Sequence, residues 1–289
     1  MNPYIQSLRL RTLPLSVSGI ILGTGMAWKA FSFQFSVFSI PFSIFSLAIL
    51  TTLSLQILSN LCNELGDAMK GTDSDQQGRE AYGLQAGTIT MRQMKNMILL
   101  FVGLSMVFGA ALILTAFPLF STPFWIFIGL GALAIIGAIK YTLGRHSYGY
   151  IGLGDLGVFL FFGLLSTCGS YYLQTRSMDW EVVCSGIAVG LPCVGVLNLN
   201  NIRDMANDRV HGKRTFASLL GPVGARVYHT LLLAGCLAIF AGYGHWWTLC
   251  IVPVWAWHTW YVWTHHEKLD KQMPILMFTT LIVAILALF

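Results

Sequence analysis

The sequence predicts an all-α integral membrane protein with nine transmembrane helices. Hydrophobic residues make up 55% of its 289 residues and charged residues only 10%, whereas soluble domains carry about 25% charged residues. Apolar runs also recur at the length of roughly 20 residues that a membrane-spanning helix needs. Together these observations exclude a large soluble catalytic domain and predict that the lipid bilayer surrounds the chain.

Nine apolar runs have spanning length, and they predict a single transmembrane domain over residues 1–289. The first run follows Arg9 and Arg11, and the second ends in a polar segment that begins at Asn60. Short connections separate the third, fourth and fifth runs. A very short turn near Gly244 separates the seventh from the eighth, so one kinked passage is the alternative at that point. In order, the runs cover residues 13–30, 39–62, 96–117, 123–141, 152–174, 181–201, 225–244, 246–263 and 273–289.

The distribution of basic residues predicts the orientation of these helices, because cytoplasmic loops retain Lys and Arg. With nine spans and a cytoplasmic N-terminus, all 17 Lys and Arg fall on the cytoplasmic side except Lys29 and Arg176. The C-terminus then lies outside, and the protein is expected to be a multi-pass protein of the cell (inner, cytoplasmic) membrane. The cations are scattered and form no basic run, so a net charge of +5 does not indicate a nucleic-acid partner.

Acidic residues gather in two segments, one after the second predicted span and one after the sixth. The chain has only 12 Asp and Glu, and several of them lie between positions 64 and 80, with Asp204 and Asp208 in the other segment. The run Asn60–Asp67 and the run Asn201–Asp208 both place polar residues at i, i+3 and i+7. Such positions share one face of an α-helix, so each span is predicted to end in a polar stripe. Both stripes face the cytoplasm.

The two stripes favour a metal-assisted reaction of a diphosphate at the membrane boundary. Carboxylates brought close together repel unless cations lie between them, and oxygen ligands suit Mg²⁺ or Mn²⁺. Mg²⁺ uses one or two carboxylates and completes its shell with phosphate oxygens and water. Cations that follow the stripes would contact the rest of the anion. A diphosphate at the end of apolar helices indicates a lipid-linked substrate whose tail lies among the spans.

Two other interpretations account for the same acids. Any single Asp could be a solvated loop charge, although two matching stripes argue against this. A secondary transporter or cation channel would also use buried carboxylates, but such proteins place them near the middle of the bilayer. The sequence Gly152–Gly157 matches the pattern G-x-G-x-x-G, yet it precedes a run of spanning length and lacks the βαβ context of a nucleotide site.

Five segments of the chain carry distinctive motifs, which are Arg11-Thr12-Leu13-Pro14, Asn60-Leu61-x-Asn63-x-x-Gly66-Asp67-x-x-Lys70-Gly71-x-Asp73, Gln85-x-Gly87-x-Ile89-Thr90, Tyr148-Gly149-Tyr150-x-Gly152-Leu153-Gly154-Asp155, and Asn200-Asn201-Ile202-Arg203-Asp204-x-x-Asn207-Asp208-x-x-x-Gly212-Lys213-Arg214-Thr215. In these segments the chain resembles the UbiA superfamily of intramembrane prenyltransferases, and within it the branch that uses 1,4-dihydroxy-2-naphthoate as acceptor. The resemblance spans nearly the whole chain. Glu64 departs from the family's usual Asp, and the stretch around Arg79 is rearranged.

The resemblance implies a UbiA-like bundle of nine helices and a Mg²⁺-dependent enzyme with two bound ions, for which Mn²⁺ is a candidate substitute. Its reaction would transfer a polyprenyl chain from polyprenyl diphosphate to 1,4-dihydroxy-2-naphthoate, with release of diphosphate and CO₂. A sibling enzyme with another aromatic acceptor, such as 4-hydroxybenzoate, is the nearest alternative.

The resemblance also implies roles for particular residues. The metal-binding and catalytic residues would be Asn63, Asp67 and Asp73 for one ion and Asp204 and Asp208 for the other. Asn201 would support the ligands or the acceptor, or cap its helix, and Asp155 would orient the acceptor. Contacts to the diphosphate would come from Lys70, Arg79, Tyr141, Arg145, Lys213 and Arg214.

Overall fold

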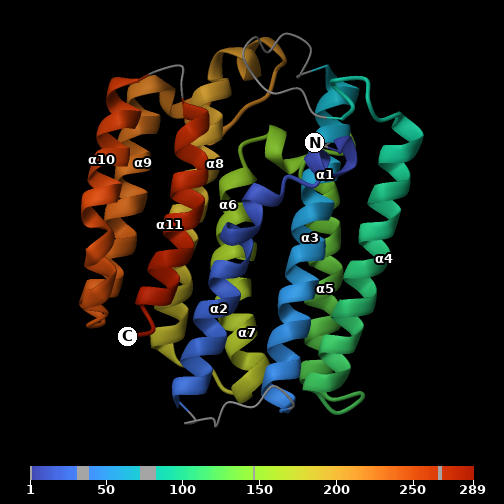
Figure 1. The fold of residues 1–289 in the computed structure, drawn as a ribbon, viewed down its shortest axis with the longest axis vertical. Coiled ribbons are helices and arrows are strands. Elements are labelled where there is room, and N and C mark those ends of the chain that lie inside the picture. Colours follow the sequence, from blue (N-terminus) through green and yellow to red (C-terminus); the bar gives the residue numbers. More distant parts are fainter. Residues whose placement is uncertain (1, 31–38, 72–82, 146, 266–268) are drawn as a thin grey trace.

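The computed structural model describes residues 2–30, 39–71, 83–145, 147–265 and 269–289, and the elements in these ranges are helices (Figure 1). The α-helices are α1 (Pro3–Ser7), α2 (Leu13–Ala30), α3 (Ile40–Lys70), α4 (Met91–Ala116), α5 (Thr122–Lys140), α6 (Gly154–Val158), α7 (Ser166–Thr175), α8 (Trp180–Val210), α9 (Phe216–Gly242), α10 (Val252–Thr264) and α11 (Gln272–Leu286). A π-helical segment, η3 (Phe159–Leu165), joins α6 to α7. Four 3₁₀ turns complete the set: η1 (Leu10–Thr12), η2 (Tyr148–Tyr150), η4 (Trp246–Ile251) and η5 (Leu269–Lys271).

Eight helical segments of the described chain are long and apolar enough to cross a membrane, and they correspond to eight of the nine predicted runs. The remaining run, 246–263, forms η4 and α10. Helix α10 has 13 residues and is shorter than each of the eight candidate spans. The seventh and eighth runs are separate helices, since α9 ends before Gly244, which has a φ of 84°. Helix α10 lies beside α9 (Figure 1), and the count of nine spans stays a prediction.

Helices α3 and α8 extend well beyond the predicted apolar runs. The predicted runs end at residues 62 and 201, whereas the helices end at Lys70 and Val210. Gly71 stops α3 in the left-handed conformation, with a φ of 69°, which a glycine adopts without steric cost. The added turns carry the polar stripes as continuous helix. Both stripes therefore keep the i, i+3, i+7 geometry expected from the sequence.

Glycines allow several helices to cross with their backbones in contact. A Cβ at Gly23 of α2 would overlap the carbonyl oxygen of Thr167 in α7. A Cβ at Gly163 of η3 would lie 2.6 Å from the Cα of Gly190 in α8. Small residues at such crossings are typical of membrane helices, where dispersion contacts rather than hydrophobic burial hold the helices together.

Two groups of helices flank α2, α6 and α7. Figure 1 shows α8 to α11 on one side of these three helices and α3 to α5 on the other. The largest buried apolar cluster joins α2 to α8, α9 and α11, and a second cluster joins α2 to α3, α4, α5 and α7. The N-terminus lies toward one end of the bundle and the C-terminus toward the other. The polar stripes of α3 and α8 are at the end where the N-terminal segment lies.

Candidate active site

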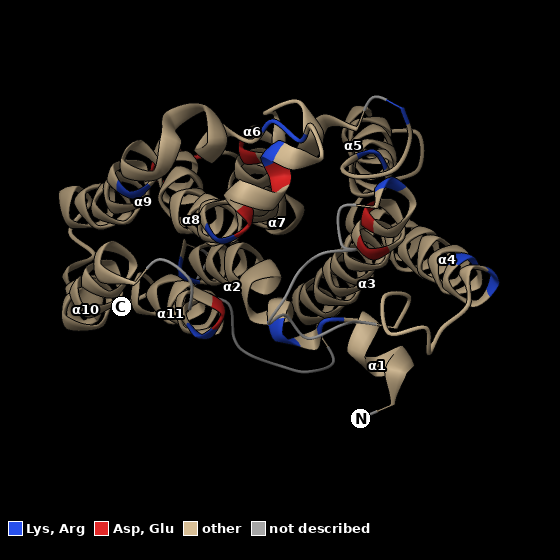
Figure 2. Ribbon diagram, turned by 90° about the horizontal axis from the view of Figure 1, so that it is seen from above, with Lys and Arg blue, Asp and Glu red and all other residues tan. Residues whose placement is uncertain are grey.

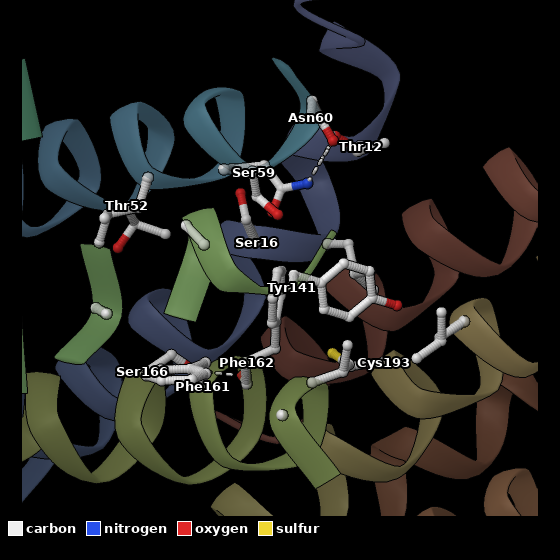
Figure 3. Close-up of a pocket in the computed structure, with 18 of the residues that line it drawn as sticks. Thr12, Ser16, Thr52, Ser59, Asn60, Tyr141, Phe161, Phe162, Ser166 and Cys193 are labelled. Atoms are coloured by element: carbon white, nitrogen blue, oxygen red, sulfur yellow. Dashed lines mark hydrogen bonds between the residues drawn. The ribbon is translucent and has the colours of Figure 1, made fainter. Parts of the chain in front are cut away.

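A cavity of about 370 Å³ opens between the two groups of helices. Its wall at one end is polar and contains both stripes, and its other end is lined by apolar side chains such as Leu130 and Leu173. Figure 2 looks onto the polar end, where acidic and basic segments of α3 lie across a gap from those of α8. Figure 3 shows Asn60 and Thr12, joined by a hydrogen bond, across the cavity from Phe161 and Phe162. The cavity thus combines a charged mouth with an apolar interior.

The stripe on α3 contributes Asn60, Asn63 and Asp67 to the cavity wall. Asn60 is a structural residue, because its Nδ2 donates to the Leu8 carbonyl at 2.9 Å and to the Thr12 hydroxyl at 3.0 Å. These bonds hold the N-terminal segment against α3. Asn63 Oδ1 accepts from the Thr142 hydroxyl, which orients the amide.

Tyr150 contacts a carboxylate of the α3 stripe and two lysines, one after each stripe. Its hydroxyl donates to Asp67 Oδ1 at 2.7 Å. The Nζ atom of Lys70 lies 3.5 Å from the centroid of the ring, and Nζ of Lys213 lies 5.5 Å from it. These are cation–π distances, so one aromatic ring holds two cations beside the carboxylate. Lys70 also donates to the Thr142 carbonyl at 2.8 Å.

The stripe on α8 contributes Asn201, Asp204 and Asp208 to the same cavity. Arg203 forms a two-pronged ion pair with Asp204, with Nε 2.7 Å from Oδ1 and Nη2 2.6 Å from Oδ2. The same guanidinium donates from Nη1 to Asp270 at 2.5 Å. This pairing fixes the carboxylate of Asp204 at the cavity mouth and ties α8 to η5.

Asp208, like Glu64 and Asp155, has a buried side-chain oxygen without a hydrogen-bond partner in the described chain, and of these three residues only Asp208 lines the cavity. It is 2% exposed, and its Oδ1 lies 3.2 Å from Nζ of Lys213. Its Oδ2 is buried and has no hydrogen-bond partner within the ranges that the structure describes. A buried carboxylate oxygen without a partner is costly unless a cation or donor binds there.

Tyr141 follows the last residue of α5 and lines the cavity near the carboxylates. Burial raises the pKa of the Tyr141 hydroxyl far above its usual value, and the neighbouring carboxylates of Asp155, Asp67 and Asp208 raise it further. The hydroxyl therefore stays protonated at physiological pH and can donate a hydrogen bond to an anion. Burial likewise raises the pKa of Tyr148 to about 12.

The donor set suits an oxygen-liganded divalent cation. Asp67 and Asp208 offer carboxylate oxygens, and Asn63 offers an amide. No three His, Cys, Asp or Glu side chains of the described chain come close enough together to form a complete metal site. Mg²⁺ needs only one or two carboxylates when phosphate oxygens and water fill its other positions. The unpartnered Oδ2 of Asp208 thus fits a metal ion that arrives with a phosphate ligand.

Several residues assigned from the sequence lie away from this cavity or outside the described ranges. The side chains of Arg145 and Arg214 are exposed and are not part of the cavity wall. Asp155 is not part of the wall either, and the hydroxyl of Tyr228 in α9 lies beside it. Asp73 and Arg79 are outside the described residues.

Other residues of the site were not assigned a role from the sequence. Arg9 and Arg11 line the cavity mouth and add positive charge to it. Tyr150 and Arg203 stood within the family motifs, but only the neighbouring acids were given roles. Two features of the sequence could have indicated roles for these residues. Tyr150 ends a Tyr-Gly-Tyr sequence, and Arg203 directly precedes Asp204.

Replacing Tyr150 by phenylalanine tests how Asp67 is oriented. The ring stays, so the contacts with Lys70 and Lys213 persist, while the hydrogen bond to Asp67 is lost. Groups that orient metal ligands typically contribute about 10- to 100-fold to metal affinity or activity. We expect the Mg²⁺ concentration for half-maximal turnover to rise about tenfold or more, measured by titration of the purified protein.

The matched control for this variant is Tyr243→Phe, whose hydroxyl contacts Cys184 rather than a carboxylate. It should titrate with Mg²⁺ like the unmodified chain. An unchanged titration for Tyr150→Phe would show that Asp67 does not depend on this hydrogen bond.

Comparison with known proteins identifies relatives along most of the chain. The model of the UbiA prenyltransferase family matches residues 18–286. A protein of Escherichia coli named 1,4-dihydroxy-2-naphthoate octaprenyltransferase is 44% identical over 240 residues, which cover 82% of this chain and 75% of that protein. A protein of the same name from Haemophilus influenzae is 40% identical over 244 residues, covering 83% of this chain and 77% of the relative.

A solved structure has the same fold at low sequence identity. A UbiA homolog from Archaeoglobus fulgidus, bound to GPP and Mg²⁺, matches with a TM-score of 0.65 over 99% of both chains. Its sequence is 16% identical, so the similarity establishes the arrangement of helices.

Proposed function

The chain belongs to the UbiA prenyltransferase family, and we propose that it transfers a polyprenyl chain from polyprenyl diphosphate to 1,4-dihydroxy-2-naphthoate. Diphosphate and CO₂ leave, and the product is demethylmenaquinol, an intermediate of menaquinone biosynthesis. The acceptor follows from the names of the relatives at 44% and 40% identity. The observation that carries the proposal is the pair of polar stripes at the mouth of an apolar cavity.

Each part of the cavity has a place in this reaction. Asn63 and Asp67, with Asp73, would hold one Mg²⁺, and Asp204 with Asp208 would hold a second. Bound Mg²⁺ would neutralise the diphosphate and favour its departure as the allylic C–O bond breaks.

Positive charge at the mouth would hold the same anion. Arg9, Arg11 and Lys213 line this part of the cavity, and cations of this kind bind phosphate oxygens by charge-assisted hydrogen bonds. Tyr141 would donate a further hydrogen bond. Mn²⁺ is expected to substitute for Mg²⁺, since both prefer oxygen ligands.

The apolar interior would protect the reactive end of the prenyl chain. Allylic cations react readily with water, and a closed apolar cavity excludes it. Phe161, Phe162 and Tyr148 line this region, and the faces of aromatic rings attract cations. The aromatic acceptor can then react with the cation before water does.

The protein is a multi-pass membrane protein, and we propose nine spans in the cell membrane with the active site on the cytoplasmic side. The site lies at the end of the bundle that collects the basic residues. The termini lie toward opposite ends of the bundle, which agrees with an odd number of passages. The ninth passage would be η4 and α10, which stand beside α9 and α11.

The location of the acids argues against a transporter. Asp67 and Asp208 lie near the C-terminal ends of α3 and α8. Transporters generally place such groups at broken helices near the bilayer midplane.

Product mass is the direct test of the proposed reaction. Purified protein is incubated with polyprenyl diphosphate, Mg²⁺ and equal amounts of the naphthoate and 4-hydroxybenzoate acceptors. We expect a prenylated, decarboxylated naphthalene product, and its formation should fall below detection when EDTA removes the metal. Prenylated hydroxybenzoate would keep the family and overturn the acceptor. Product formation unaffected by EDTA would overturn the role of the metal.

A further inference from the structure

The polar stripe of α3 continues one turn further into the cavity, to Gln56. Residues 56, 60, 63 and 67 follow the spacing i, i+4, i+7 and i+11, so they share one face of the helix. All four line the cavity. Gln56 is seven residues before Asn63, which places it about 10 Å deeper along the helix axis. The stripe thus extends from the carboxylates at the mouth to a neutral amide in the interior.

Hydrogen bonds fix the orientation of the Gln56 amide. Asn60 donates from Nδ2 to the Leu8 carbonyl at 2.9 Å, and because a carbonyl can only accept, Oδ1 of Asn60 must face the other way. This oxygen accepts from Nε2 of Gln56 at 3.3 Å. The same Nε2 donates at 3.0 Å to the hydroxyl of Thr12, whose own proton goes to the Arg9 carbonyl. Turning the Gln56 amide over would set its oxygen against two other oxygens.

The oxygen of this amide is an acceptor without a donor. Oε1 of Gln56 is buried and has no hydrogen-bond partner in the described chain. Asp208 is the other residue of the cavity wall with such an oxygen in the described ranges, and it is proposed to bind a metal ion. A buried acceptor that lacks a donor is costly. Gln56 therefore has the capacity to accept a hydrogen bond from a molecule in the cavity.

The cavity beside this amide suits a flat aromatic molecule. Asn60 and Thr12, which hold the Gln56 amide, lie on one side of the cavity, and Phe161 and Phe162 lie on the other (Figure 3). Aromatic faces and edges pack favourably against another ring. An aromatic ring between these walls can contact the phenylalanines while a substituent at its edge reaches the amide.

Of the two proposed substrates, the aromatic acceptor brings the hydrogen-bond donor. The ionised diphosphate offers oxygen acceptors, and the prenyl chain is hydrocarbon. By contrast, 1,4-dihydroxy-2-naphthoate carries two hydroxyls. Its 1-hydroxyl is next to the carboxylate and donates to it within the molecule, as in salicylate. The 4-hydroxyl is therefore the donor that is free to bind the protein.

We infer that Gln56 is a specificity-determining residue, whose Oε1 accepts a hydrogen bond from the 4-hydroxyl of the aromatic acceptor. This inference rests on the proposed function. A site built to bond a hydroxyl rejects analogues that lack it, because a buried polar group then stays unpaired. The hydroxyl is meta to the carboxylate in the naphthoate and para to it in 4-hydroxybenzoate. The benzoate therefore cannot place both groups where the naphthoate places them.

Acceptor analogues test this contact in the unmodified protein. The dissociation constants of 1,4-dihydroxy-2-naphthoate, 1-hydroxy-2-naphthoate and 4-hydroxy-2-naphthoate are measured with Mg²⁺ and a polyprenyl thiolodiphosphate that does not react. Loss of the 4-hydroxyl should raise Kd about tenfold or more, whereas loss of the 1-hydroxyl should change it by less than about threefold. A 1-hydroxy compound that binds as tightly as the diol, or as tightly as the 4-hydroxy compound, would overturn the inference.

Replacing Gln56 by methionine tests the protein's side of the contact. Methionine has a similar length and lacks the amide. For Gln56→Met we expect the Kd of the diol to rise about tenfold, while the Kd of 1-hydroxy-2-naphthoate changes by less than about threefold. Equal losses for all three acceptors would show that Gln56 only supports Thr12 and Asn60, and would overturn the inference. If this variant fails to fold, the analogue series in the unmodified protein still decides.

The matched control is Gln174→Met. Gln174 also donates from Nε2, to the Pro41 carbonyl at 2.9 Å, and its Oε1 is also buried without a partner in the described chain. It does not line the cavity. The control should therefore bind all three acceptors like the unmodified protein, and a similar loss of diol binding in both variants would overturn the inference.

Turnover of the unmodified protein separates this inference from the proposed function. If the prenylated naphthalene product forms but the two monohydroxy analogues bind equally well, the role of Gln56 is refuted and the reaction stands. If the unmodified protein makes no product from the naphthoate, the proposed function itself is refuted.

Discussion

Replacing Asp208 by asparagine is expected to reduce turnover by more than about 100-fold. Loss of a group that only orients a metal ligand typically costs about 10- to 100-fold, and Asp208 is proposed to be a ligand. Its Oδ2 is buried and has no partner within the described parts of the chain, so the carboxylate has capacity for a cation. Asparagine keeps the size of the side chain and removes the charge. The rate of product formation at saturating Mg²⁺ measures the effect.

Lys213 loses its ion-pair partner in this variant. A loss of turnover caused by unfolding must therefore be distinguished from a loss caused by the missing metal ligand. A melting curve of the purified variant shows whether the protein is still folded. The matched control is Asp179→Asn at the other end of α8. Asp179 caps that helix by accepting from the backbone N–H of Glu181, and asparagine caps a helix about as well as aspartate. Near-normal turnover by a folded Asp208→Asn variant would remove Asp208 from the metal site.

The polar stripes could be predicted because helix periodicity fixes their geometry. Residues at i, i+3 and i+7 share a face whatever the surrounding fold is. Asn63 and Asp67 therefore line one cavity together with Asp204 and Asp208, as the spacing indicated. The sequence also predicts that the two helices share one site, because both carry carboxylates at the same end of a span.

The partners of these residues could not be predicted from spacing. Tyr150 is 83 positions from Asp67 in the sequence, and the pairing depends on how the turn after α5 folds back over α3. Arg203 is adjacent to Asp204, yet its second partner is Asp270, 67 positions away. Such contacts depend on how segments distant in the sequence pack together, so no periodic pattern in the sequence predicts them.

The predicted apolar runs are shorter than helices α3 and α8. Hydropathy detects the part of a helix that lies in lipid, whereas α3 and α8 continue as polar helix to Lys70 and Val210. The run 246–263, which the sequence predicts as a span, forms η4 and the 13-residue helix α10 beside α9 and α11.

Replacing Gly163 by valine is expected to destabilise the fold more than any surface change. A Cβ at Gly163 would lie 2.6 Å from the Cα of Gly190 and 2.7 Å from the carbonyl oxygen of Gly186. Both are backbone atoms of α8, so the overlap is relieved only if η3 and α8 move apart. Overpacking typically costs about 1–3 kcal/mol and more where the surroundings are rigid. We expect a loss of about 3 kcal/mol or more, seen as a melting temperature lower by roughly 5–10 °C.

The control for this substitution is Gly129→Val on the exposed face of α5. A Cβ at Gly129 would meet no heavy atom of the described chain within 4 Å, so the same change of side chain should leave the melting temperature within a few degrees. Gly163→Ala should fall between the two, because it adds the overlapping Cβ without the branches. If Gly163→Val melted like the Gly129→Val control, the backbones of η3 and α8 would not be in the contact that the structure indicates. Because η3 also carries Phe161, a separation of these helices should reduce turnover together with stability, and the two losses should track each other across the three variants.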